Sequence, residues 1–156
     1  MRMYSIVFPV LSTLDSVIII RKSWWQTGIL YDAPTGEMDG HEPLEVRVMG
    51  ILNEEIGVSE EDCQYIGNSN EKISGICSTF IDGVYLNVFY VVLKSNTPYC
   101  KMGRGELKVF KFKDLINPFD ERFDGFGQID YFIRLIYEDL IVARVNVKKE
   151  DFCDVK

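Results

Sequence analysis

Two adjacent glutamates, Glu54 and Glu55, are the residues whose type and spacing most directly suggest chemistry. Neighbouring like charges do not stabilise a helix, but carboxylate oxygens are the ligands that Mg²⁺ and Mn²⁺ prefer. The pair therefore indicates either a divalent-metal site or an ordinary solvated acidic patch.

A helix must position this pair. Apolar residues recur at helical spacing before and around it, at Leu44, Val48, Met49, Leu52 and Ile56. This stripe predicts a helix from about Pro43 to Ile56 with one face in a core. Pro43 suits a first helical turn, where its missing N–H would have no partner, and Gly57 ends the helix.

Ile51, Glu54 and Glu55 are related by i,i+3 and i,i+4 spacing on the predicted helix. Their side chains should therefore share a face beside the apolar stripe, with Glu54 turned furthest from it. Gly50 lies in the middle of the same helix and costs about 1 kcal/mol of helix stability relative to alanine.

The segment from Gly36 to Val58 resembles the Nudix box. The family pattern is Gly, five residues, Glu, seven residues, Arg-Glu, an aliphatic, any residue, Glu-Glu, any residue, Gly and an aliphatic. The positions that agree are Gly36, Glu42, Leu52, Glu54, Glu55, Gly57 and Val58. Gly50 and Ile51 stand where the family has Arg-Glu, so the resemblance is stronger for the fold than for the chemistry.

The resemblance implies an α+β Nudix fold, with a mixed sheet sandwiched between helices, and a divalent cofactor, Mg²⁺ or Mn²⁺. The implied metal ligands are Glu54, Glu55 and the main-chain carbonyl of Thr35. Glu106 matches a late carboxylate that lies near the metals, although it could equally be an ordinary surface residue. Ile51 replaces a carboxylate, so the general base would come from Glu54, Glu106 or Glu121.

The resemblance also implies a brace for the loop before the helix. In the family, the box Arg holds this loop through the glutamate at the position of Glu42. Gly50 cannot do so, and Arg47 lies one turn earlier. We expect Arg47 either to reach Glu42 and replace the missing arginine, or to be a plain solvent-exposed side chain. Gly36 would complete this loop-bracing group.

Arg21 and Trp25 are the candidates for binding substrate. The strand from Ser16 to Arg21 resembles a Nudix strand whose terminal arginine can face phosphate, and a simple strand-end charge is the alternative. Trp24 or Trp25 could stack on a base or pack at a sheet edge. The residues from Asp32 to Gly36 resemble the segment before the box in ADP-ribose and nucleotide-sugar pyrophosphatases, with Asp for Glu and Thr for Ala.

Composition limits the alternatives. A chain of 156 residues with 47% hydrophobic residues can bury the core of one domain, which we place at residues 1–156 with a loose tail from about 146. The net charge of −7 argues against general nucleic-acid binding. Widely spaced cysteines, a single histidine and no long apolar run predict a cytoplasmic protein without a zinc site or membrane span.

Strand and helix patterns fill in the rest of the fold. We expect strands at 4–11, weakened by Pro9, and at 29–36, with a late strand at 105–115. Two runs, 73–81 and 85–93, flank Asp82-Gly83 and predict a tight hairpin; the second is so apolar that both of its faces should be covered. Apolar residues spaced from Ile129 to Leu140 predict an amphipathic helix on the sheet.

Two functions fit these patterns. The first is a Nudix-type pyrophosphohydrolase that cleaves a nucleoside diphosphate linked to another moiety with metal-activated water, acting on a nucleotide-type small molecule. The second is a Nudix-fold module, impaired in catalysis, that binds a nucleotide, an RNA end or a protein partner. The loss of Arg-Glu at Gly50 and Ile51 favours the second, whereas the retained glutamates favour the first. A homodimer is left open.

Overall fold

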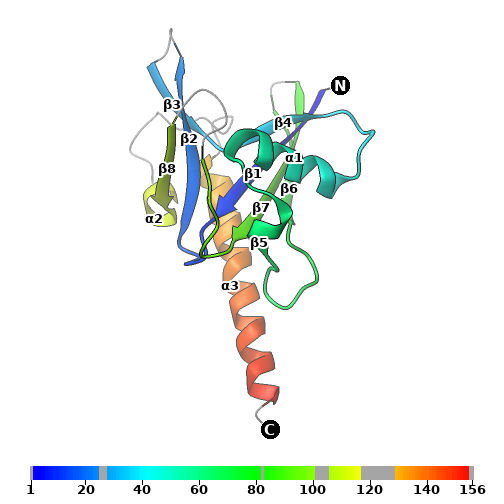
Figure 1. Cartoon of the computed structure of the whole chain (residues 1–156), viewed down its shortest axis with the longest axis vertical. Helices are drawn as coiled ribbons and strands as arrows, with labels where there is room; N and C mark the ends of the chain where they lie inside the picture. Colours follow the sequence, from blue (N-terminus) through cyan, green and yellow to red (C-terminus); the bar gives the residue numbers. More distant parts are fainter. Residues whose placement is uncertain (1, 25–27, 82, 101–105, 117–128, 155–156) are drawn as a thin grey trace.

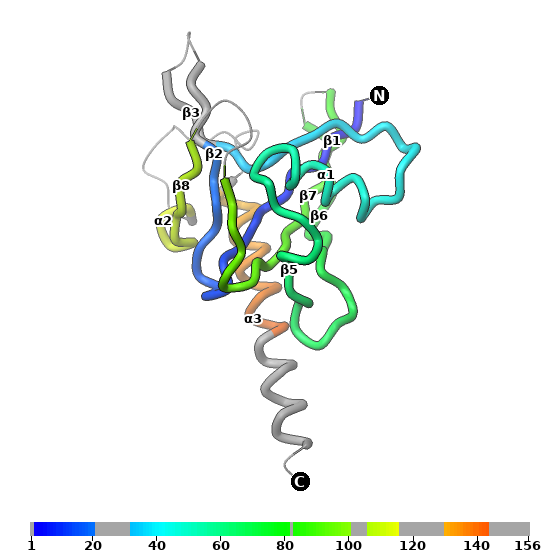
Figure 2. The backbone as a smooth tube through the Cα atoms, in the orientation of Figure 1, coloured from blue at the N-terminus to red at the C-terminus, as the bar shows by residue number. Residues whose placement is uncertain are grey.

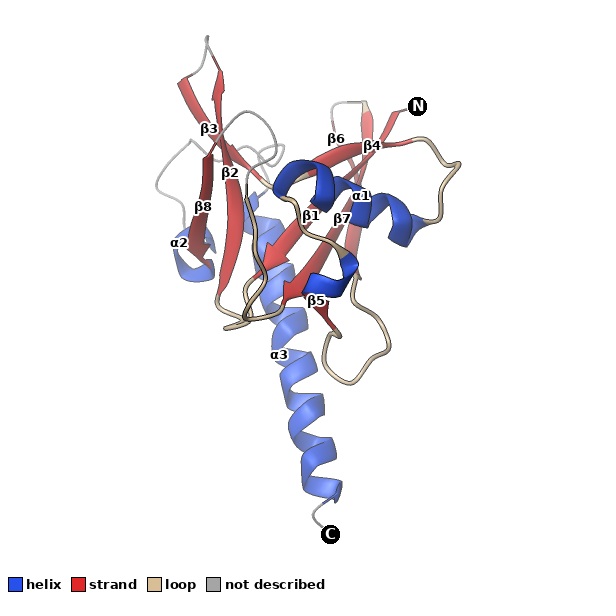
Figure 3. Cartoon of the chain, in the orientation of Figure 1, coloured by secondary structure: helices blue, strands red, loops and turns tan. Residues whose placement is uncertain are grey.

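The computed structural model describes residues 2–24, 28–81, 83–100, 106–116 and 129–154; side chains are described except at 21–24, 28–31, 116, 129 and 144–154. The chain builds one mixed sheet with helices on both faces (Figures 1 and 3). Its path can be followed in Figure 2. No helix in the described part of the chain is long and apolar enough to cross a membrane.

The strands of the sheet are β1 (Arg2–Val10), β2 (Ser16–Trp24), β3 (Gly28–Asp32), β4 (Thr35–Met38), β5 (Cys63–Gln64), β6 (Ser74–Ile81), β7 (Val84–Leu93) and β8 (Glu106–Lys111). The main order is β3-β2-β1-β7-β5, with β4 paired to β1, β6 to β7 and β8 to β2. Only β1 and β7 run parallel; the other pairs are antiparallel.

Strand β7 lies at the centre of the sheet, as its apolar run predicts. Alternate residues of β7 face opposite sides, and the last of them are buried on both. The hairpin with β6 is confirmed, since Ile81 pairs with Val84 across the turn, where Gly83 has a φ of 79°. A left-handed φ of this kind suits glycine because it has no Cβ.

Pro9 does not interrupt β1, although it weakens the sequence signal for this strand. The N–H of Val7 points away from β7 and bonds to the carbonyl of Pro34 at 2.9 Å. By alternation, the missing N–H of Pro9 also points away from β7, just beyond the last β1 residue that pairs with β4. The proline therefore leaves the ladder with β7 intact.

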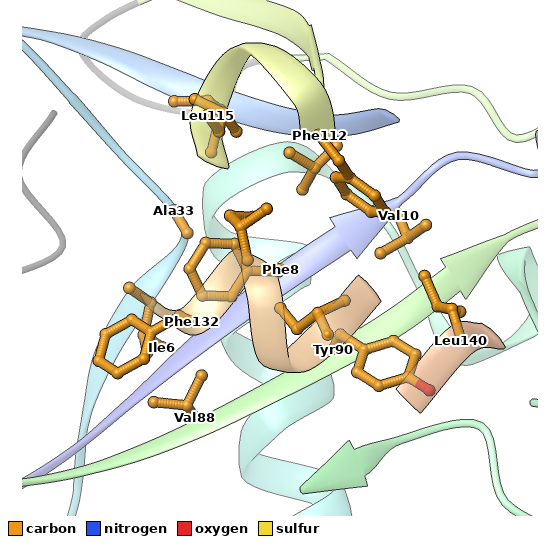
Figure 4. Packing of buried hydrophobic residues seen from close by; sticks show 14 of the residues in the cluster. Ile6, Phe8, Val10, Ala33, Val88, Tyr90, Phe112, Leu115, Phe132 and Leu140 are labelled. Carbon is orange, nitrogen blue, oxygen red and sulfur yellow. The ribbon is translucent and has the colours of Figure 1, made fainter. Parts of the chain in front are cut away.

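The helices are α1 (Leu44–Ile56), α2 (Phe112–Ile116) and α3 (Ile129–Asp154), with a short 3-10 turn, η1, at Glu60–Asp62. Helix α1 packs on one face of the sheet, where Val48, Ile51, Leu52 and Ile56 join side chains of β1, β2 and β7. Helices α2 and α3 pack on the other face. Figure 4 shows this second core, in which Phe8 contacts Phe132 edge to face.

Several element boundaries differ from the sequence expectation. The segment 29–36 forms two strands rather than one. Strand β3 pairs with β2, whereas β4 pairs with β1. Pro43 is the N-cap of α1 rather than a residue within it, and Leu44 is exposed instead of buried. The late strand ends at Lys111, where α2 begins, and α3 continues through the segment expected as a tail.

Candidate functional site

Helix α1 presents the two box glutamates next to the buried edge of its apolar stripe. Glu54 is 68% exposed, whereas Glu55 is half-buried. Gly57 ends the helix with a left-handed φ of 71°, and its N–H bonds to the carbonyl of Asn53. This glycine cap fixes where the helix stops, one turn after the glutamates.

Ile51 does not share the exposed face with these glutamates. It is 1% exposed and packs in the core between α1 and the sheet. The family position that normally carries a carboxylate is therefore a hydrophobic core position in this chain. The sequence spacing alone placed Ile51 beside the stripe, whereas in the structure it belongs to the core and lies close to Gly36 of β4.

That close approach depends on Gly36. A Cβ built on Gly36 would lie 2.7 Å from Cγ1 of Ile51 and 2.9 Å from Nη2 of Arg47. Both distances are shorter than ordinary side-chain contacts, so any larger residue would push β4 away from α1. Gly36 is thus required by packing.

Arg47 ties the loop before α1 to the helix itself. Its Nε donates to the main-chain carbonyl of Glu37 at 2.8 Å, and its Nη1 donates to Oε1 of Glu54 at 3.4 Å. The guanidinium is mostly covered, with 21% of the side chain exposed. Arg47 therefore braces β4 through Glu37, and within the described residues it forms no bond with the exposed Glu42.

The main-chain carbonyl of Thr35 lies on the outer edge of β4. Odd-numbered residues of β1 form the hydrogen-bonded pairs with β4, because Val7 bonds to Pro34 in a register that pairs Ser5 with Gly36. The carbonyls of Thr35 and Glu37 consequently point away from β1. Glu37 uses its carbonyl to bind Arg47, whereas no described residue donates to the carbonyl of Thr35.

Ser5 lies directly opposite Gly36 and was not singled out in the sequence. Its side chain is fully buried and its hydroxyl has no partner among the described residues. A serine within an otherwise apolar strand was the available signal. Such an unpaired group is costly, which marks the junction of β1 and β4 as a place where packing is not optimised for stability.

The register between β2 and β8 does not bring Glu106 next to Glu54. It pairs with Arg21 across β2 and β8, and Leu107, the next residue, packs into the α1-side core. Alternation along the strand therefore directs Glu106 to the α3 side of the sheet. Trp25 and Glu121 lie outside the described residues, as does the side chain of Arg21.

A metal site on α1 would have few protein oxygen donors. Within the part of the chain that the structure describes, no group of three or more His, Cys, Asp or Glu side chains comes together. The candidate donors are therefore Glu54, Glu55 and the free carbonyl of Thr35. Mg²⁺ commonly uses only one or two protein carboxylates, with waters and substrate phosphates as its other ligands, so this set is compatible with that ion.

Comparison with known proteins identifies the fold. No protein-family model and no curated protein sequence matches the chain. Among solved structures, the MutT described for Aliivibrio salmonicida and Vibrio cholerae is similar with a TM-score of 0.63 and 15% identity, covering 88% of this chain and 98% of that chain. An Ap4A hydrolase from C. elegans has a TM-score of 0.64 and 12% identity, covering 90% and 98%.

A third similar structure is a possible asymmetric diadenosine tetraphosphate hydrolase from Jonesia denitrificans, with a TM-score of 0.64 and 12% identity over 89% of this chain and 94% of that chain. At such low identity these similarities show the fold alone. Together with the helix-covered mixed sheet they confirm the predicted α+β Nudix fold.

Proposed function

We propose that this chain is a pyrophosphohydrolase of the Nudix type, which cleaves a nucleoside diphosphate linked to another moiety. The observation that carries the proposal is the Arg47 brace, which holds the box loop against the helix that bears Glu54 and Glu55. This brace fixes the loop carbonyl of Glu37 next to the carboxylate of Glu54, which would help to hold the proposed metal-binding segment in place. The names of two structural neighbours, an Ap4A hydrolase and a possible diadenosine tetraphosphate hydrolase, support a nucleotide-type substrate.

Glu54, Glu55 and the carbonyl of Thr35 would hold Mg²⁺ or Mn²⁺ together with substrate phosphate. When bound, the ion would neutralise charge on the phosphates and lower the pKa of water. Since the protein supplies few donors, we expect the ion to bind weakly alone and more tightly with the substrate. Trp25 is the proposed platform for the base, whereas Arg21, the register partner of Glu106, is the weaker candidate for contacting a further phosphate.

Glu54 is the proposed general base, in which case its Oε2 is not a metal ligand and Glu55 and the Thr35 carbonyl would hold the ion. The Oε1 atom of Glu54 accepts a hydrogen bond from Arg47. The other oxygen, Oε2, has no partner among the described residues, and the ion pair with Arg47 orients the carboxylate. Water oxygen would bond to one phosphorus as the bond from that phosphorus to the bridging oxygen breaks. The proton of the water passes to Oε2, and the bridging oxygen leaves on the departing phosphate. Glu106 is the weaker candidate because its register directs it to the other face.

A second function is favoured by two observations in the same site. Ile51 is buried where the family has a carboxylate, and Glu54 is already paired with Arg47. Both features reduce the negative charge that a metal would meet. The alternative is therefore a module that binds a nucleotide, an RNA end or a protein partner without hydrolysing it.

The test is a hydrolysis screen of the purified chain with Mg²⁺ or Mn²⁺ across ADP-ribose, nucleotide sugars, dinucleotides, nucleoside triphosphates and capped RNA. Glu55→Gln should abolish turnover, whereas Glu45→Gln, an exposed glutamate in the first turn of the same helix, should leave it unchanged. Silence across the panel, with ligand binding that survives Glu55→Gln, would establish the binding module instead.

The setting we propose is the cytoplasm. No disulfide joins the described cysteines Cys63, Cys77 and Cys100 to one another. Persistent free thiols are typical of a reducing compartment.

A further inference from the structure

An open surface cavity of about 600 Å³ lies beside α3, and its lining does not include Glu54 or Glu55. It is formed between α3 and the loop that leads from β5 to β6. Its described lining includes the apolar side chains of Ile66, Ile73 and Val142 and the carboxyl groups of Glu71 and Asp139, with no Lys or Arg. A volume of this size is typical of small-molecule sites.

The loop that walls the cavity is fixed by its own hydrogen bonds. The N–H of Ile66 donates to the carbonyl of Glu71 at 3.0 Å, and the hydroxyl of Ser69 donates to the carbonyl of Ile66 at 2.7 Å. Gly67, with a φ of 57°, lets the loop approach α3 so closely that a Cβ there would lie 3.2 Å from Cβ of Ala143. The wall is therefore preformed and needs little ordering when a ligand binds.

Asp139 is oriented at the cavity wall by two hydroxyl groups. Tyr90, fully buried in the sheet, donates its phenolic O–H to Oδ2, and Ser74 donates to the same oxygen at 3.4 Å. Burial and the neighbouring carboxylate raise the pKa of Tyr90, so the phenol stays protonated and remains the donor. Oδ1 has no partner among the described residues, and Asp139 lines the cavity.

A half-buried carboxylate with one fixed and one unpaired oxygen is an acceptor for a cationic donor. A carboxylate removed from bulk water pairs most favourably with a charged donor, because such hydrogen bonds are about twice as strong as neutral ones. Glu71 supplies a second carboxyl group at the rim, whereas the apolar lining suits a short hydrocarbon chain. Phosphate groups would be repelled by the same charges, which distinguishes this cavity from the proposed substrate site.

We propose that this cavity binds a small aliphatic amine, with one ammonium group on Asp139, the hydrocarbon chain against Ile66, Ile73 and Val142, and a second ammonium group on Glu71. The ligand class is thus a short α,ω-diamine. Glu54, Glu55 and Thr35 do not line the cavity, so the proposal stands whether or not α1 carries out hydrolysis.

The experiment is isothermal titration of the full-length chain with 1,4-diaminobutane, alongside n-butanol and glutarate as ligands that lack ammonium groups. We expect saturable 1:1 binding of the diamine and none of the two controls. Asp139→Asn keeps an acceptor for Tyr90, and it should weaken binding about tenfold or more, as the loss of one charge-assisted hydrogen bond does. Glu71→Gln should weaken it in the same direction.

Glu138→Gln is the matched control, because Glu138 is an exposed acidic residue next to Asp139 that does not line the cavity. It should bind the diamine as the unmodified chain does. The proposal is overturned by the absence of saturable binding, or by equal affinity in all variants. It is also overturned if Glu138→Gln weakens binding as much as the cavity variants, which would indicate general surface charge. If Asp139→Asn does not fold, the affinity of Glu71→Gln for the diamine, compared with that of Glu138→Gln, tests the proposal.

Discussion

Gly36 and Ile51 are in such close contact that a methyl group on Gly36 would lie 2.7 Å from Cγ1 of Ile51. This contact joins β4 to α1, and Ile51 is a buried core residue. The glycine and the isoleucine are therefore complementary, and the packing of the box depends on both.

Gly36 and Gly50 should respond to alanine in opposite directions. At Gly36, alanine would overpack the junction and lower the free energy of unfolding by about 1–3 kcal/mol. At Gly50, the nearest atom to an added Cβ is Nη1 of Arg47 at 3.8 Å, an ordinary contact. Gly50→Ala should raise the free energy of unfolding by about 1 kcal/mol, because alanine favours the helix. Urea denaturation of both variants tests this, and a destabilised Gly50→Ala would contradict it.

Loss of the Arg47 brace should affect both stability and the site. Arg47→Met removes the bonds to Glu37 and Glu54 and should lower the free energy of unfolding by about 1–2 kcal/mol. Arg47→Lys keeps a charge near Glu54 but lacks the guanidinium fork, so it should recover only part of the loss. Denaturant midpoints of the two variants measure this. Full recovery by lysine would show that charge alone matters.

The bond between Tyr90 and Asp139 should contribute to the attachment of α3. Tyr90→Phe leaves the half-buried carboxylate without its main donor and should cost about 1–3 kcal/mol of unfolding free energy. Tyr137→Phe is the control, since Tyr137 is exposed and its ring contact with Phe112 would be kept. Equal thermal midpoints for the two variants would mean that the Tyr90 hydroxyl does not hold α3.

The raised pKa of the buried Cys63 thiol leads us to expect a loss of folding stability at alkaline pH. Burial, with a smaller effect from Asp62, raises the pKa of the Cys63 thiol from 9.0 to about 11. Because the folded-state pKa is above the unfolded value, the stabilisation is full below pH 9 and is lost as the pH rises toward 11. The melting temperature should fall across this range, and the fall should be smaller in Cys63→Ala, in which the tyrosines still titrate. Parallel curves would contradict the assignment.

The main elements of the fold could be predicted because their apolar patterns were long. The continuous run of β7 required cover on both faces, and the stripe of α1 ended at a glycine that does form the cap. Strand β4 is short and carries no apolar alternation, so only its pairing with β1 defines it. Helix α3 extends past the apolar repeat because a polar sequence can continue a helix without supplying a periodic signal.

The candidate site was less predictable, because it depends on contacts between elements. Spacing placed Ile51 beside the glutamates, but in the structure Ile51 packs in the core between α1 and the sheet. Arg47 was expected to reach Glu42 or to lie free in solvent. Its partner proved to be a main-chain carbonyl of Glu37, and carbonyls leave no trace in residue identity. The face of Glu106 follows from the register between β2 and β8, which the sequence does not encode locally.

The most direct test of the central claim compares Glu54→Gln with Glu106→Gln on the best substrate from the screen, under saturating Mg²⁺ or Mn²⁺. If Glu54 on α1 is the base, Glu54→Gln should lower kcat about 100-fold or more, as loss of a general base does, whereas Glu106→Gln should change it little. A large loss in Glu106→Gln with Glu54→Gln unaffected would contradict the account and move the chemistry off α1.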